Sequence, residues 1–152
     1  MKSKNITWQE IDSYINILIL SLYKDQYYPD LIVGVTRGGL VPAVMLSHKL
    51  NIPMVPLNVS FRTKEEDFNN LVIEDRGAKN ILLIDEINDS GKTFRKIIEA
   101  NPNLGIRTAC LFENMGSDWS CEYLAETVKD GEWINFPKER KILLTWSSFL
   151  LS

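Results

Sequence analysis

The chain has 152 residues and a formal net charge of −3 at pH 7, which is the length of one domain with a sizeable core. It has neither a basic run nor interleaved aromatic and basic residues, so nucleic acid is disfavoured as its main partner. The N-terminal segment MKSKNITWQE lacks the apolar core of a signal peptide and no apolar run is long enough to span a bilayer, so we expect no integral membrane segment.

The first predicted element is an amphipathic helix near the N-terminus. Thr7 and Glu10 have the spacing of a capping box, and Ile6 and Ile11 are placed for a hydrophobic staple. The apolar residues that follow recur at helical spacing and predict one buried face, made of Trp8, Ile11, Ile15, Leu18 and Leu22.

Strands and a helix alternate in the next part of the chain. The pattern predicts a buried strand over residues 31–35, a turn over 36–39, a helix over 40–50 and a strand over 55–59. Residues 61–79 are polar and acidic without clear periodicity, and a loop of that length in a compact domain is usually functional or mobile. We expect this loop to close over a bound ligand.

The most informative segment spans residues 80–94 and reads NILLIDEINDSGKTF. Its first five residues predict a buried parallel strand, and Asp85 and Glu86 stand where that strand is expected to end. A polar turn over 89–93 then opens a helix, whose free backbone N–H groups and dipole favour an anion. The two acids can accept hydrogen bonds from hydroxyl groups or bind a metal ion. A ribose 5-phosphate has hydroxyl groups for the acids and a phosphate for the start of the helix.

Two other interpretations of this segment are weaker. A Walker-type phosphate loop needs a glycine five residues before Gly91, but Glu86 stands there, and an acid would repel phosphates. An ordinary strand, turn and helix would explain Asp89 and Ser90 as capping residues, but it leaves the two adjacent acids unexplained.

The C-terminal part predicts a strand over 107–112 and a short strand over 133–136, and it leaves 116–131 unassigned. Cys110 and Cys121 lack metal-site spacing, so we expect free thiols in a reducing cytoplasm. Alternating strands and helices predict an α/β fold with a mainly parallel central sheet flanked by helices. Ligands bind at the carboxyl ends of such strands, so the segments that follow the strands should converge at one edge.

Two segments carry a resemblance to a known family. Residues 80–94 resemble the phosphoribosyl pyrophosphate (PRPP) motif of type I phosphoribosyltransferases, with Ser90 in the usual threonine position. Residues 37–42, RGGLVP, resemble the pyrophosphate loop of the xanthine-guanine phosphoribosyltransferases and their purine-specific relatives. The resemblance spans almost the whole chain and implies one phosphoribosyltransferase domain over 1–152, with a mobile loop and a small base-recognition hood.

The resemblance also implies a role for each motif. Asp85 and Glu86 would hold the ribose hydroxyls and a Mg²⁺ ion, and with Asp89, beside the base, they would form the catalytic group. The 5′-phosphate would lie on Asp89, Ser90, Gly91, Lys92 and Thr93. Pyrophosphate would lie on Thr36, Arg37, Gly38 and Gly39.

Base recognition departs from the family pattern. Relatives carry a lysine after the fourth strand that faces the exocyclic oxygen of a purine, and an alignment through Phe112 and Gly116 places Glu113 there. An ionised carboxylate cannot donate a hydrogen bond to a carbonyl oxygen, which predicts a weaker preference for 6-oxopurines. The base residues implied by the resemblance are Glu113, Trp133, Ile134 and Lys138, with Lys138 as a substitute donor.

The implied function is Mg²⁺-dependent transfer of the 5-phosphoribosyl group from PRPP to a nucleobase, with a purine expected first, by a homodimer or homotetramer. The alternative is a regulatory protein that binds PRPP or a nucleotide on the same fold without turnover. A plain interaction module would leave both anion-binding segments unexplained.

Overall fold

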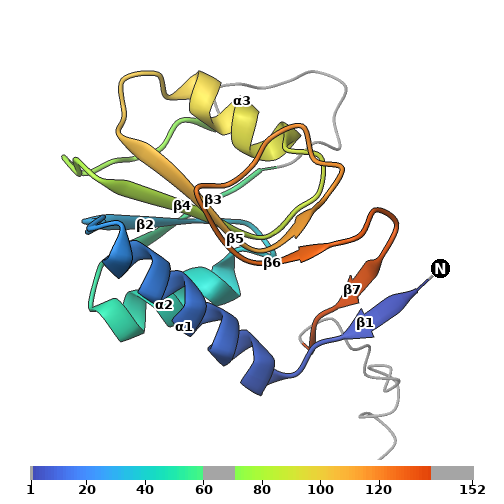
Figure 1. The fold of residues 1–152 in the computed structure, drawn as a ribbon. Coiled ribbons are helices and arrows are strands. Elements are labelled where there is room, and N and C mark those ends of the chain that lie inside the picture. Colours follow the sequence, from blue (N-terminus) through green and yellow to red (C-terminus); the bar gives the residue numbers. More distant parts are fainter. Residues whose placement is uncertain (1, 60–70, 138–152) are drawn as a thin grey trace, which may run out of the picture.

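The computed structural model describes residues 2–59 and 71–137. Its main sheet has five strands in the order β3-β2-β4-β5-β6, and every neighbouring pair is parallel. Helices α1 and α2 cover one face of this sheet and α3 covers the other (Figure 1). In chain order the elements are β1 (Ser3–Asn5), α1 (Trp8–Lys24), β2 (Leu31–Val35), α2 (Leu40–Leu50), β3 (Met54–Leu57), β4 (Ile81–Asn88), α3 (Lys92–Ala100), β5 (Ile106–Asn114), β6 (Tyr123–Val128) and β7 (Trp133–Asn135).

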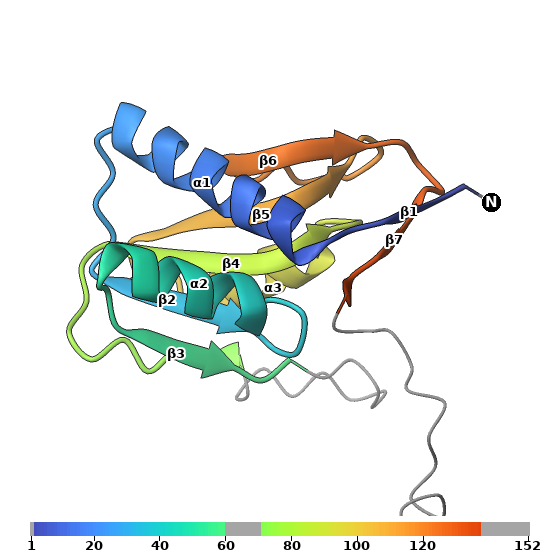
Figure 2. The same ribbon diagram turned by 90° about the horizontal axis from the view of Figure 1, so that it is seen from below.

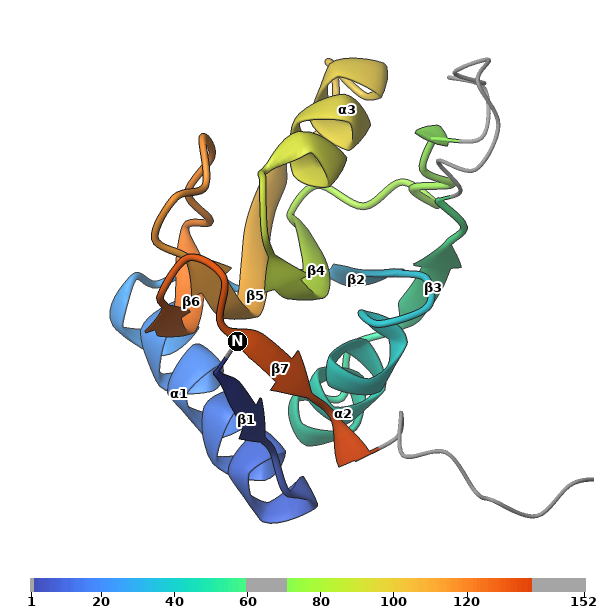
Figure 3. The ribbon, with the colours of Figure 1, turned by 90° about the vertical axis from the view of Figure 1, so that its right-hand side faces the viewer.

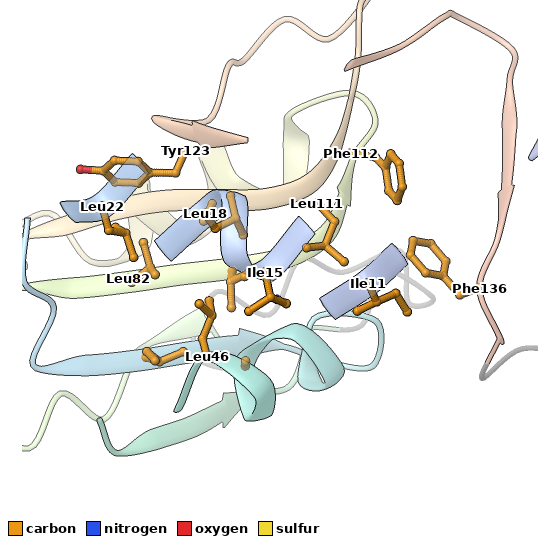
Figure 4. Packing of buried hydrophobic residues seen from close by; sticks show 14 of the residues in the cluster. Ile11, Ile15, Leu18, Leu22, Leu46, Leu82, Leu111, Phe112, Tyr123 and Phe136 are labelled. Atoms are coloured by element: carbon orange, nitrogen blue, oxygen red, sulfur yellow. The ribbon is translucent and has the colours of Figure 1, made fainter. Parts of the chain in front are cut away.

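Helix α1 begins with the predicted capping box. The Thr7 side chain accepts a hydrogen bond from the Glu10 N–H at 3.1 Å, and the Glu10 carboxylate accepts one from the Thr7 N–H at 2.8 Å. The predicted apolar face is confirmed apart from Trp8, which is 52% exposed because it stands at the first helical position, before the face turns toward the sheet. The buried residues of α1 meet α2 and the sheet in one apolar layer, shown with Phe112 and Phe136 in Figure 4.

A second apolar layer lies between the sheet and α3. Phe94 and Ile97 of α3 are buried there with Leu71 and Ile73. The buried Asn101 side chain fixes that segment, since it accepts a hydrogen bond from the Ile73 N–H at 2.9 Å and donates one to the Leu71 carbonyl at 2.8 Å. Residues 71–73 are therefore anchored, contrary to a mobile loop over all of 61–79. Residues 61–70 of that predicted lid lie outside the described part of the chain.

Strand β4 is longer than the sequence predicted. It runs to Asn88 instead of ending at Ile84, because β5 continues beside it and pairs Asn88 with Glu113. Asp85 and Glu86 therefore lie within the strand, near its carboxyl end. Strand β6 occupies part of the unassigned segment 116–131, and β1 was not predicted.

Strands β1 and β7 form a separate two-stranded parallel sheet. Figure 2 shows the arrowheads of β2, β3 and β6 pointing toward the side of the molecule where this small sheet lies. Figure 3 shows β1 and β7 side by side in front of the main sheet. The small sheet thus stands beyond the carboxyl ends of the main strands. No helix in the described ranges is both long enough and apolar enough to cross a membrane.

The buried face of α1 predicts that substitutions at two positions of that helix will differ strongly in their effect on the free energy of unfolding. Ile15 is fully buried and Leu20 is 58% exposed. Ile15→Ala should lower the free energy of unfolding by about 2–5 kcal/mol, because it leaves a cavity. Leu20→Ala should change it by about 0.5 kcal/mol or less. Urea denaturation followed by circular dichroism measures both, and equal losses would contradict this packing.

Candidate active site

The turn after β2 lies directly on the carboxyl end of β4. A Cβ atom on Gly39 would lie 2.4 Å from the Ile84 carbonyl oxygen and 2.7 Å from that of Val35. A Cβ atom on Gly38 would lie 2.4 Å from Glu86 Oε1. At Gly39 the close atoms belong to the backbone, so a side chain there would clash, and the candidate pyrophosphate loop lies directly against β4. Arg37 is exposed on this loop, and the Thr36 hydroxyl donates to Asn58 Oδ1 at 3.0 Å.

Asp85 and Glu86 are both half-buried on β4. Successive side chains of a strand point to opposite faces, and Glu86 lines the pocket described below while Asp85 does not. The Asp85 Oδ1 atom accepts a hydrogen bond from the Glu86 N–H at 2.7 Å, which fixes the orientation of its carboxylate. The two acids offer hard oxygen donors of the kind that Mg²⁺ prefers.

The polar turn after β4 leads into α3 as the sequence predicted. Gly91 caps the helix with φ of +81°, a left-handed conformation that favours glycine. The Lys92 N–H lies 3.4 Å from Ser90 Oγ, and a Cβ atom on Gly91 would lie 2.4 Å from Trp119 Cβ. The start of a helix leaves backbone N–H groups without partners inside the helix, so the start of α3 after Ser90 and Gly91 can favour an anion.

A pocket of about 450 Å³ lies between the end of β4, the end of β5 and the small sheet. Its walls combine carboxylates with apolar side chains. The lining residues are Glu86, Ile87, Asp89, Asn114, Val128, Asp130, Gly131, Glu132, Trp133, Ile134 and Phe136. The structure therefore brings Glu86 and Asp89 of the first motif together with Trp133 and Ile134, which the sequence placed at the base.

The small sheet holds one wall of this pocket in place. The Trp133 N–H donates to the Lys2 carbonyl and the Ile6 N–H donates to the Asn135 carbonyl, each at 3.0 Å. Phe136 packs against Phe112 of β5, with ring centroids 5.8 Å apart. These contacts leave the Trp133 side chain 60% exposed at the pocket, where it can stack on a planar ring.

Glu113 does not line the pocket, contrary to its expected place at the base. It is buried, and its carboxylate accepts hydrogen bonds from Asn88 Nδ2 at 3.0 Å, the Ser120 hydroxyl at 2.8 Å and the Cys121 N–H at 2.7 Å. Its neighbour Asn114 faces the pocket instead, because side chains alternate along β5. Glu113 and Asn114 thus lie on opposite faces of β5, and only Asn114 is on the face of the pocket. Lys138, the substitute donor, lies outside the described residues.

Three polar side chains of the pocket were missed by the sequence reasoning, namely Asn114, Asp130 and Glu132. Strand β5 is buried on both faces, so its apolar run has no alternation that would reveal the face of Asn114. Asp130 and Glu132 lie in the turn between β6 and β7, and only Asp130 falls within the segment 116–131 that the sequence left unassigned.

Cys110 and Cys121 are free and buried, and their sulfur atoms lie with a Glu113 oxygen within 4.8 Å of one another. The hydrogen bond with the Cys121 thiol and the burial raise the pKa of the Cys110 thiol. This cluster belongs to the interior behind the pocket.

Glu113 is predicted to support stability. Glu113→Gln removes the charge of a side chain that accepts three hydrogen bonds, and hydrogen bonds to a charged acceptor are the stronger ones. The free energy of unfolding should fall by about 1–3 kcal/mol in chemical denaturation. Glu74→Gln, the same change at an exposed position, serves as the control. Unchanged stability of Glu113→Gln would contradict the buried contacts.

Comparison with known proteins agrees with this geometry. The family described as phosphoribosyl transferase domain matches residues 5–141. A xanthine-guanine phosphoribosyltransferase of Cereibacter sphaeroides is 30% identical over 148 residues, covering 90% of this chain and 86% of the relative. One from Chromohalobacter salexigens is 27% identical over 135 residues, covering 87% and 81%.

Solved structures give the same result for the fold. A purine phosphoribosyltransferase from Pyrococcus horikoshii superposes with a TM-score of 0.73 at 30% identity, covering 95% of this chain and 99% of the other. A xanthine-guanine-hypoxanthine phosphoribosyltransferase of Helicobacter pylori gives a TM-score of 0.74 at 22% identity, covering 88% and 91%. With the family match over most of its length, this chain belongs to the phosphoribosyltransferases.

Proposed function

We propose that the protein transfers the 5-phosphoribosyl group from PRPP to a purine in a Mg²⁺-dependent reaction that releases pyrophosphate. One observation carries this proposal: Glu86 touches the pyrophosphate-loop candidate at Gly38 and also lines the pocket. A ligand held at Glu86 would thus have a glycine-rich anion loop on one side and a base-sized pocket on the other. PRPP and a purine together have this arrangement of groups.

Each segment then has a part in the reaction. The turn over 89–93 would hold the 5′-phosphate, and the loop of Arg37 would hold pyrophosphate. Asp85 and Glu86 would orient the ribose hydroxyls. The reaction develops positive charge at ribose C1 as pyrophosphate leaves, so holding both reactants in line and stabilising the leaving group are the main tasks. Asp89 lines the pocket and would accept the proton of the base N–H.

Asp85 and Glu86 would hold the Mg²⁺ ion, mostly through water, as the carboxylate chemistry of this pair and the open backbone at Gly38 allow. The ion would neutralise charge on the pyrophosphate oxygens. The protein residues supply the orientation, since the Glu86 N–H holds Asp85 and the loop of Gly38 and Gly39 lies fixed against β4.

A purine is the proposed base because the similar proteins are named as purine or xanthine-guanine phosphoribosyltransferases. The pocket volume suits one planar base next to Trp133. We also propose a homodimer or homotetramer in the cytoplasm. Exposed Leu20, Tyr23 and Tyr28 offer apolar surface for assembly, and the two free thiols suit a reducing compartment.

The acidic pair is the first test. The double variant Asp85→Asn with Glu86→Gln should lower Mg²⁺-dependent release of pyrophosphate from PRPP by about 100-fold or more, because the ribose and the ion lose charged acceptors. The same chemical changes at Asp12 and Glu99, which lie outside the pocket lining, should leave the rate unchanged. An unchanged rate in the double variant with bound PRPP would remove the acids from the site.

Substitution of Arg37 tests the proposed pyrophosphate subsite independently of the proposed phosphate turn. Arg37→Ala should weaken the binding of PRPP and of pyrophosphate by about 10- to 100-fold, because charge-assisted hydrogen bonds are lost. A nucleoside monophosphate, which lacks pyrophosphate, should bind almost as before. Isothermal titration calorimetry measures all three ligands. An equal loss for the monophosphate would place Arg37 outside the pyrophosphate subsite.

A further inference from the structure

Asn114 lies in the pocket wall between two carboxylates. Its Nδ2 atom donates to Asp89 Oδ1 at 2.9 Å and to Asp130 Oδ1 at 3.3 Å. Its Oδ1 atom accepts from the Gly116 N–H at 2.8 Å. Asn114, Asp89 and Asp130 all line the pocket, and they come from β5, the turn after β4 and the turn after β6. One amide therefore joins three segments that meet at the pocket.

These partners fix the orientation of the Asn114 amide. Turning the amide over would place its oxygen against two carboxylates and its NH₂ group against a backbone N–H. Both amide hydrogens are therefore used within the protein. While these contacts last, Asn114 has no hydrogen left to donate to a ligand.

The groups that remain for a ligand at this wall are acceptors. Asp89 and Asp130 each keep a second carboxylate oxygen, and ionised carboxylates only accept hydrogen bonds. The described lining residues include no lysine, arginine or histidine. A carbonyl oxygen of a base placed against Asp89 and Asp130 would meet carboxylate acceptors, whereas an amino group would donate to them. The side chains of Val128, Trp133 and Phe136 offer apolar surface to the ring.

We propose that Asn114, Asp89 and Asp130 form an acceptor edge that selects a base with an amino group at this position over the same base with a carbonyl group. This inference rests on the proposed function and specifies its substrate class as an aminopurine. Asn114 and Asp130 are the specificity-determining residues, since Asp89 also has a part in the reaction.

The test compares bases that differ in one substituent. Adenine and hypoxanthine differ at C6 by an amino against an oxo group, and guanine and xanthine differ in the same way at C2. Pyrophosphate release from PRPP with Mg²⁺ gives kcat/KM for each base. The amino member should be preferred by about tenfold or more in at least one pair, because a mismatched polar contact has an effect of this size. Preference for the oxo member, or equality, in both pairs would overturn the inference.

Two variants connect the preference to the proposed residues. Asn114→Lys would place an ammonium group between the two carboxylates and leave a hydrogen for a carbonyl oxygen. Asp130→Asn would turn one acceptor into a group that can also donate. Each variant should lower the ratio of kcat/KM for the amino base to kcat/KM for the oxo base by about tenfold. Because both values come from the same variant, this ratio is insensitive to a general loss of activity. Asp12→Asn, on the exposed side of α1, is the matched control and should leave the ratio unchanged.

The outcomes separate the two proposals. Release of pyrophosphate with the oxo bases preferred would overturn the acceptor edge alone. No release with any of the four bases, and no binding of PRPP in calorimetry, would overturn the proposed function and the acceptor edge with it. An amino preference that neither variant changes would remove Asn114 and Asp130 as its origin.

Discussion

The close packing of Gly38 and Gly39 on the carboxyl end of β4 is the constraint on which the rest of the site depends. A single added Cβ at Gly39 would collide with backbone oxygens of two strands, and one at Gly38 would collide with the Glu86 carboxylate. The loop after β2 therefore lies packed against the strand that carries Asp85 and Glu86. A third glycine, Gly91, has the same effect at the phosphate turn, where Trp119 fills the space that a side chain would need. Contacts of this kind set the relative positions of loops that lie far apart in sequence.

The pocket wall depends on contacts between two distant parts of the chain, because β1 at its start packs with the strands that follow β5. Strand β1 supplies the backbone partners of β7, and Lys4 of β1 forms an ion pair with Glu126 of β6 at 2.6 Å. Phe112 and Phe136 close the apolar layer beneath this junction. The wall that carries Trp133 is thus held at its outer side by hydrogen bonds and at its inner side by packing. The turns after β2 and β4, by contrast, follow strands of the main sheet.

Much of the fold followed from local patterns. The capping box at Thr7 and Glu10 gave the start of α1, and the continuous apolar run at residues 31–35 gave β2. The ends of β4 and β5 depend on each other, because each strand continues only as far as the other supplies partners, and no local pattern shows this. Strands β1 and β6 are stabilised by distant partners in the same way. Placing Asn114 in the pocket requires knowing on which face of β5 its side chain lies. The sequence of a strand that is buried on both faces does not show this.

The pairing of β1 with β7 makes the first residues of the chain part of the pocket's construction. Ser3, Lys4 and Asn5 pair along their backbone with β7, the strand that presents Trp133 and Ile134. An affinity tag fused ahead of Ser3 would therefore emerge beside the strand that forms this wall of the pocket. Such a fusion would disturb the wall, so preparations meant for specificity measurements are better made without an N-terminal extension.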